Sequence, residues 1–108
     1  MREMDRATLL ARIRERFASN SYVFTWHAIE KGEERGILIE EVEEAVLAED
    51  AEIIEDYPED SRGPSCLILG WTARRRPLHV QVSYPPEVRV ITVYEPELER
   101  WIGYRVRR

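Results

Sequence analysis

The sequence predicts an α+β fold in which N-terminal helices pack on one face of a four-stranded antiparallel sheet. Before about residue 50, apolar residues recur at the spacing of a helix. After that point they alternate with polar residues at the period of two that a half-buried strand requires. Short connections rich in turn residues separate the later segments. Because the apolar side of a sheet must be covered, we expect the helices to cover it.

Three helices are expected in the first half. The first follows Asp5, an N-capping residue, and runs to about residue 19. The second runs from the capping Thr25 to about residue 35, and Gly36 supplies the left-handed residue that ends it. The third covers residues 37–48 and has an acidic outer face. Between the first two, residues 22–24 are expected to be extended.

Four strands in a meander follow, over residues 52–57, 65–72, 78–84 and 88–95. Residues 97–102 are expected to make a final helical turn. In the third strand, the apolar Leu78, Val80 and Val82 alternate with polar residues, so the two sets lie on opposite faces. If Ile91 and Val93 complete the core, one polar set shares the open face of the sheet: His79, Gln81, Ser83, Thr92 and Tyr94.

Length and composition place the chain among soluble globular proteins. Its 108 residues and 12.8 kDa predict a single α+β domain over residues 1–108. The longest apolar run, residues 66–69, is far shorter than a membrane helix needs, and the N-terminus has no apolar signal core. We therefore expect a cytoplasmic protein without a membrane partner. The single cysteine, Cys66, excludes an internal disulfide and is expected in the core.

Charge divides the chain in two. Residues 1–61 contain seven Lys and Arg against seventeen Asp and Glu, a balance of −10, whereas residues 62–108 contain nine Arg and four Glu, a balance of +5. An acidic helical part and a basic sheet part are therefore expected to present different surfaces. Arg74, Arg75 and Arg76 border the polar face at a turn, where guanidinium groups can bind phosphate bidentately. The alternative is a solvated acidic face with an incidental excess of arginine.

Seven short segments, in their order along the chain, carry a resemblance to a known family. They are His27-Ala28, Glu34-Arg35-Gly36-Ile37, Val42-Glu43-Glu44-Ala45, Ile53-Ile54-Glu55-Asp56-Tyr57-Pro58, Cys66-Leu67-Ile68-Leu69-Gly70, Arg76-Pro77-Leu78-His79-Val80 and Ile91-Thr92-Val93-Tyr94-Glu95-Pro96. Over residues 22 to about 101 the chain resembles the bacterial domain of unknown function family 4258. That family is similar in layout to the RelE and BrnT ribonuclease toxins.

The resemblance implies the toxin of a type II toxin–antitoxin pair, acting as a metal-independent endoribonuclease with an antitoxin protein as partner and no cofactor. Such cleavage needs a base, an acid and cations around the phosphate. His79, whose ordinary pKa is about 6.5, would be base or acid, and Tyr94 or a nearby arginine would be its partner. Arg76 would bind the phosphate, and Arg74, Arg75 and Gln81 would contact RNA.

His27 has three interpretations. It lies on one helix face with Glu30 and Glu34, but a transition-metal site needs more nitrogen or sulfur ligands, so no metal is expected. It can instead start the helix and hydrogen-bond to the sheet. In the third interpretation it joins the active site with Arg35 as its cation.

The overall acidity departs from the ribonuclease-toxin pattern, since RNA affinity depends largely on phosphate contacts. Either RNA binding is confined to the arginine-rich edge, or RNA is not the ligand. The alternative function is a non-catalytic protein-binding domain of the same fold. The oligomeric state stays open.

Overall fold

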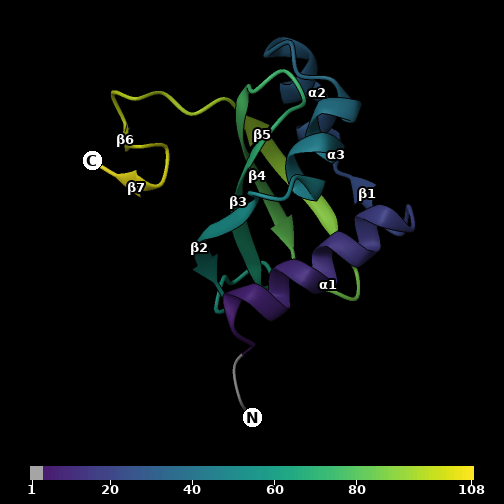
Figure 1. Ribbon diagram of the computed structural model, residues 1–108. Helices are drawn as coiled ribbons and strands as arrows, with labels where there is room; N and C mark the ends of the chain where they lie inside the picture. The colour runs from purple at the N-terminus through teal and green to yellow at the C-terminus, as the bar shows by residue number, and fades with distance from the viewer. Residues whose placement is uncertain (1–3) are drawn as a thin grey trace.

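The computed structural model describes residues 4–108, and its architecture is α+β. Three helices lie on one side of a central sheet, and a small hairpin lies on the other side (Figure 1). The helices are α1 (Arg6–Ala18), α2 (Trp26–Glu34) and α3 (Ile39–Leu47). No helix within residues 4–108 combines the length and the apolar character needed to cross a membrane.

The sheet has five strands and is mixed, which corrects the prediction of four antiparallel strands. The expected meander is present as β2 (Glu52–Tyr57), β3 (Ser65–Trp71), β4 (Pro77–Ser83) and β5 (Arg89–Tyr94). A short strand, β1 (Val23–Phe24), pairs in parallel with β5 and gives the order β1-β5-β4-β3-β2. Two residues are too few to show an alternating pattern, so the sequence indicated only an extended segment.

Side-chain caps explain why the first two helices begin where predicted. The Asp5 carboxylate accepts a hydrogen bond from the Thr8 amide at 2.8 Å, and the Thr25 hydroxyl accepts one from the Ala28 amide at 3.1 Å. Gly36, with φ of 65°, ends the second helix as expected. The third helix begins two residues later than predicted.

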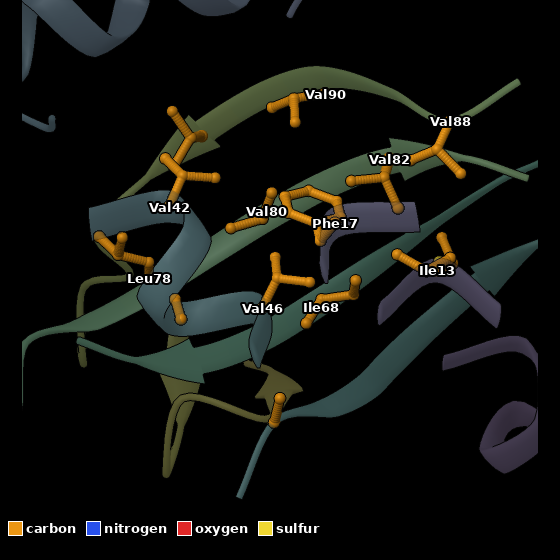
Figure 2. Packing of buried hydrophobic residues seen from close by; sticks show 14 of the residues in the cluster. Ile13, Phe17, Val42, Val46, Ile68, Leu78, Val80, Val82, Val88 and Val90 are labelled. Atoms are coloured by element: carbon orange, nitrogen blue, oxygen red, sulfur yellow. The ribbon is translucent and has the colours of Figure 1, made fainter. Parts of the chain in front are cut away.

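The core lies between the helices and one face of the sheet. Leu78, Val80 and Val82 are fully buried there, as predicted, and pack with residues of α1 and α3 (Figure 2). Gly70 allows α3 to lie directly against β3, because a Cβ at this position would be only 2.0 Å from the Ala45 carbonyl oxygen. Cys66 is buried in the same core.

An irregularity between β4 and β5 corrects part of the predicted core. His79 pairs with Tyr94 and Gln81 with Thr92, which puts these four residues on one face as expected, but Val82 pairs with Val90. The extra residue on β5 is Ile91, which is half-buried, while Val90 is fully buried and takes its place in the core. The irregularity lies beyond Thr92, so Thr92 and Tyr94 share one face with His79 and Gln81, as the alternation predicted.

Residues 97–101 make a single turn in which the Arg100 and Trp101 amides donate to the Glu97 carbonyl at 3.0 and 3.1 Å, so the predicted helical turn is present in part. The chain then forms a β-hairpin, which was not predicted. Its strands are β6 (Trp101–Ile102) and β7 (Val106–Arg107). Gly103 and Tyr104 have φ of 56° and 65°, and the Arg105 amide donates to the Ile102 carbonyl at 3.0 Å, as in a type I′ turn. The hairpin lies on the side of the sheet opposite α3 (Figure 1), so this face is not open around His79.

Candidate functional site

A histidine–tyrosine pair lies beneath the C-terminal hairpin. His79 on β4 and Tyr94 on β5 are directly opposite each other, and the Tyr94 hydroxyl is 3.1 Å from Nδ1 of His79. The indole of Trp101 covers the imidazole edge-on, with ring centroids 4.4 Å apart. As a result His79 has no exposed surface, while Tyr94 is half-buried. Any solvent contact of this pair is made through Tyr94.

The hairpin backbone fixes the tautomer of the imidazole. Nε2 of His79 is 2.7 Å from the carbonyl oxygen of Tyr104, which can only accept a hydrogen bond. Nε2 therefore carries the proton, and in the neutral ring Nδ1 must be an acceptor. The Tyr94 hydroxyl then donates to Nδ1 and keeps its oxygen lone pairs for another donor. The pair is oriented to accept a proton at the Tyr94 oxygen.

Both groups are neutral at pH 7. Burial lowers the pKa of His79, an effect that outweighs the opposing hydrogen bond to Tyr104 and the nearby charge of Glu55. Burial raises the pKa of Tyr94, although the charge of Arg107 opposes this. Tyr94 therefore carries its phenol proton, and Nδ1 of His79 is free to accept the hydrogen bond from it.

Tyr94 opens into a surface pocket of about 520 Å³. The pocket is formed by the end of β5, the C-terminal end of α2 and the hairpin, and the structure thus brings together residues far apart in the sequence. Besides Tyr94, its lining residues are Arg35, Glu95, Glu97, Arg100, Trp101 and Arg107.

The three arginines differ in how far their charge is compensated. Arg107 is 2.9 Å from the Glu55 carboxylate and stacks over Trp101, and Arg100 is 3.9 Å from Glu97. Arg35 donates only to the backbone carbonyl of Val93, at 2.8 Å. Within residues 4–108 no carboxylate forms an ion pair with Arg35. Arg35 is thus the pocket cation best placed to take an anionic ligand.

Glu55, on the edge strand β2, forms an ion pair with the pocket residue Arg107. Burial alone would raise the pKa of its carboxyl, but hydrogen bonds from Arg107 and Tyr57 outweigh burial and hold the pKa below its usual value. The same pairing raises the pKa of Arg107. Together with the pair of Arg105 and Glu52 at 2.7 Å, these contacts fasten the hairpin to β2.

The structure places the predicted arginine turn outside this pocket. Arg74 is exposed, and Arg75 pairs with Asp50 at 3.2 Å on another side of the sheet. Arg76 is half-buried; it pairs with Glu95 at 2.6 Å and Glu41 at 3.3 Å and also donates to the Gly36 carbonyl. It joins α2 and α3 to the end of β5 and reaches the pocket only through Glu95.

Two further predicted residues lie elsewhere. His27 is exposed on the first turn of α2 and does not line the pocket. Gln81 lies on the same sheet face as His79, donates to the Ser65 hydroxyl at 3.1 Å and lines a separate cleft with Arg62 and Arg89. Of the predicted site residues, Tyr94 and Arg35 line the pocket, and His79 lies behind Tyr94.

Sequence reasoning missed the hairpin contribution, above all Trp101, Tyr104 and Arg107. A signal was present: Ile-Gly-Tyr-Arg-Val over residues 102–106 has a glycine between apolar residues of high strand propensity. A hairpin prediction would have placed an aromatic and arginine-rich segment beside the sheet.

The donor set of the pocket suits an anion. Three guanidinium groups and a phenol line it, together with the carboxylates of Glu95 and Glu97, which pair with Arg76 and Arg100. The described residues contain no group of three or more His, Cys, Asp and Glu side chains that could bind a metal ion. The arrangement can bind a phosphate or carboxylate and accept a proton from a bound hydroxyl at Tyr94.

The fold and the pocket define a small α+β protein in which a buried histidine and a half-buried tyrosine lie behind an arginine-lined pocket. Residues 24–95 match the family model described as Domain of unknown function (DUF4258), and the chain belongs to this family. Comparisons with curated proteins and with solved structures gave no match. The match ends at residue 95, so the hairpin that covers His79 lies outside it.

Proposed function

We propose that the protein is a metal-independent endoribonuclease, the toxin of a type II toxin–antitoxin pair, similar in layout to RelE and BrnT. One observation supports this most: Tyr94, whose hydroxyl is held by a neutral, tautomerically fixed His79, lines a pocket that also contains three arginines. RNA cleavage requires proton removal from a 2′-hydroxyl beside a phosphate, and these groups are arranged for that step.

In the proposed reaction, the 2′-oxygen attacks phosphorus and the bond from phosphorus to the 5′-oxygen breaks. The 2′-hydroxyl proton passes to the Tyr94 oxygen as the phenol proton passes to Nδ1 of His79. The leaving 5′-oxygen takes a proton from solvent, and His79 later returns its proton to solvent. The products are a 2′,3′-cyclic phosphate and a 5′-hydroxyl.

Arg35 and Arg107 supply the positive charge that the reaction needs. Charge builds on the phosphate oxygens as the new bond forms, and preorganised cations in a partly buried pocket stabilise that charge. Arg35 is positioned by the Val93 carbonyl and Arg107 by Glu55, so neither has to reorganise when RNA binds. Arg76 would act indirectly, by holding Glu95 away from the phosphate.

The test is cleavage of single-stranded RNA by purified, partner-free protein in buffer with chelator. Tyr94→Phe keeps the ring but removes the hydroxyl, so we expect the rate to fall about 100-fold or more. Arg74→Gln, an exposed position outside the pocket, should leave the rate unchanged. Absence of cleavage by the unaltered protein, or full activity of Tyr94→Phe, would refute the proposal.

A non-catalytic binding domain is the second candidate, and the full burial of His79 favours it. Both imidazole nitrogens have partners within the fold, as in a purely structural histidine. In that case the fold would bind a protein partner and leave RNA intact. A stable complex with a protein partner, without any cleavage of RNA, would select this function.

A further inference from the structure

We propose that the groove between α2 and α3 is a docking site for a basic amphipathic helix of a protein partner. This inference does not depend on the chemistry proposed for Tyr94 and His79. The groove has a volume of about 260 Å³ and is lined by residues of α2, of α3 and of the segment between them. Both helices lie at the same end of the sheet (Figure 1). Its lining is predominantly apolar: Phe24, Ala28, Ile29, Gly32, Ile37, Leu38, Ile39, Val42 and Val93, with Glu33 and Glu40.

Large apolar side chains at the groove are left in water. Leu38 is 62 % exposed, Ile39 50 % and Ile29 38 %. Helical spacing places Trp26, which is 80 % exposed, on the same side of α2 as Ile29 and Glu33. A contiguous exposed apolar patch with a polar rim is typical of a protein interaction site.

The extent of the patch favours a protein segment over a small molecule. A compound that filled the hollow would leave the Trp26 indole uncovered. A partner helix lying along two neighbouring helices can cover the hollow and the rim together, with side chains at i, i+3, i+4 and i+7 entering the groove.

The negative charge of α2 and α3 favours a positively charged partner. The sequences of α2 and α3 contain seven glutamates and one lysine. Among residues 4–108, neither Glu33 nor Glu40 has an ion-pair partner, and both line the groove. A helix with Lys or Arg flanking its apolar stripe would pair with these carboxylates. A second copy of this chain would instead bring like charges together.

The experiment uses the full chain and a synthetic amphipathic helix of leucine and lysine, with a scrambled peptide of the same composition as the comparison. Calorimetry should show saturable one-to-one binding of the amphipathic peptide only. Leu38→Ser removes an apolar groove residue and places a favourable capping residue at the start of α3, so the fold is preserved. We expect it to weaken binding about tenfold.

Leu98→Ser is the matched control, because Leu98 is 49 % exposed and lies outside the groove; it should not change binding. Glu33→Gln with Glu40→Gln should weaken binding and reduce its salt dependence. Equal binding of the scrambled peptide, or equal effects of Leu38→Ser and Leu98→Ser, would overturn the proposal. So would a dimer of the free protein that Leu38→Ser dissociates, since the groove would then belong to a second copy.

Discussion

The burial of His79 links the candidate site to the stability of the protein. His79 has no exposed surface, and burial lowers its pKa. The imidazole is therefore neutral in the folded protein at neutral pH. In the unfolded chain the pKa returns to about 6.5. The same low pKa keeps Nδ1 unprotonated at neutral pH, so that it can accept the hydrogen bond from the Tyr94 hydroxyl.

The stability of the protein should therefore fall with acid in a defined window. Because the folded pKa of His79 is below the unfolded value, the unfolded state binds more protons as the pH falls below about 6.5, and the free energy of unfolding decreases. Urea unfolding across this range should show a steeper loss for the natural protein than for His79→Gln, in which the side chain at position 79 does not titrate. Parallel pH profiles for the two proteins would contradict the burial of a neutral imidazole.

At the scale of elements, the hairpin covers a second apolar surface of the sheet. Leu67 and Leu69 lie on the same face as His79, and both are buried, as is Trp101 above them. The hairpin has only two residues in each strand, so packing and ion pairs must hold it in place.

Trp101 should be the main apolar anchor of the hairpin. Trp101→Ala is expected to destabilise the protein by about 3 kcal/mol, since it removes a buried indole and exposes His79. The neighbouring Ile102 is 52 % exposed, and Ile102→Ala should cost well under 1 kcal/mol. Denaturant unfolding of the two variants measures the difference. Equal costs would show that the hairpin does not pack on the sheet in solution.

A second element-scale prediction concerns the contact of α3 with β3. Gly70→Ala would place a Cβ 2.0 Å from the backbone of Ala45, and backbone cannot rotate away as a side chain can. We expect a loss of about 3 kcal/mol as the helix is displaced. Gly36→Ala is the comparison, because its Cβ meets nothing within 4 Å and only its φ of 65° is unfavourable, at a cost of about 1 kcal/mol. A ranking in the reverse order would argue against the close approach.

These elements show how far the sequence could predict the fold. The periodicities and caps located all three helices and the four-stranded meander, because each such element leaves a local pattern. Strand β1 has no such local pattern. It is held by hydrogen bonds from the amides of Val23 and Thr25 to the carbonyls of Val88 and Val90, which lie far along the chain. The displacement of Ile91 by Val90 likewise depends on a strand irregularity that no alternation pattern reveals.

The candidate site was predictable to a similar degree. Alternation placed His79 and Tyr94 on one face correctly, because strand parity is a local property. It could not show that Trp101 would cover His79, or that Arg76 would pair with Glu95 and Glu41, since these contacts join segments distant in the sequence. Arg35, identified by its place beside His27, reaches the pocket through the end of α2 instead.

At the scale of the whole molecule, the division of charge separates two surfaces. The acidic α2 and α3 carry the apolar groove, and the arginine pocket lies between the end of α2, β5 and the hairpin. An anionic polymer is repelled by the first surface and attracted only to the second. If RNA is the ligand, few phosphates should be contacted, in contrast to a uniformly basic nuclease.

The salt dependence of RNA binding measures that number. For single strands, the slope of log affinity against log salt is about −0.7 per phosphate neutralised, so three pocket arginines predict a slope of about −2. Binding of labelled single-stranded RNA to Tyr94→Phe, followed by fluorescence anisotropy over a series of salt concentrations, gives the slope. Arg35→Gln in this background should make it shallower by about 0.7.

Arg74→Gln in the same background distinguishes the two placements of the RNA. The sequence-based hypothesis assigns Arg74 a phosphate contact and predicts the same decrease in slope as for Arg35→Gln. The pocket predicts none, because Arg74 is not among the residues that line it. An unchanged slope for Arg74→Gln together with a reduced slope for Arg35→Gln would locate the phosphate at the pocket. The opposite pair of results would move it to the turn between β3 and β4.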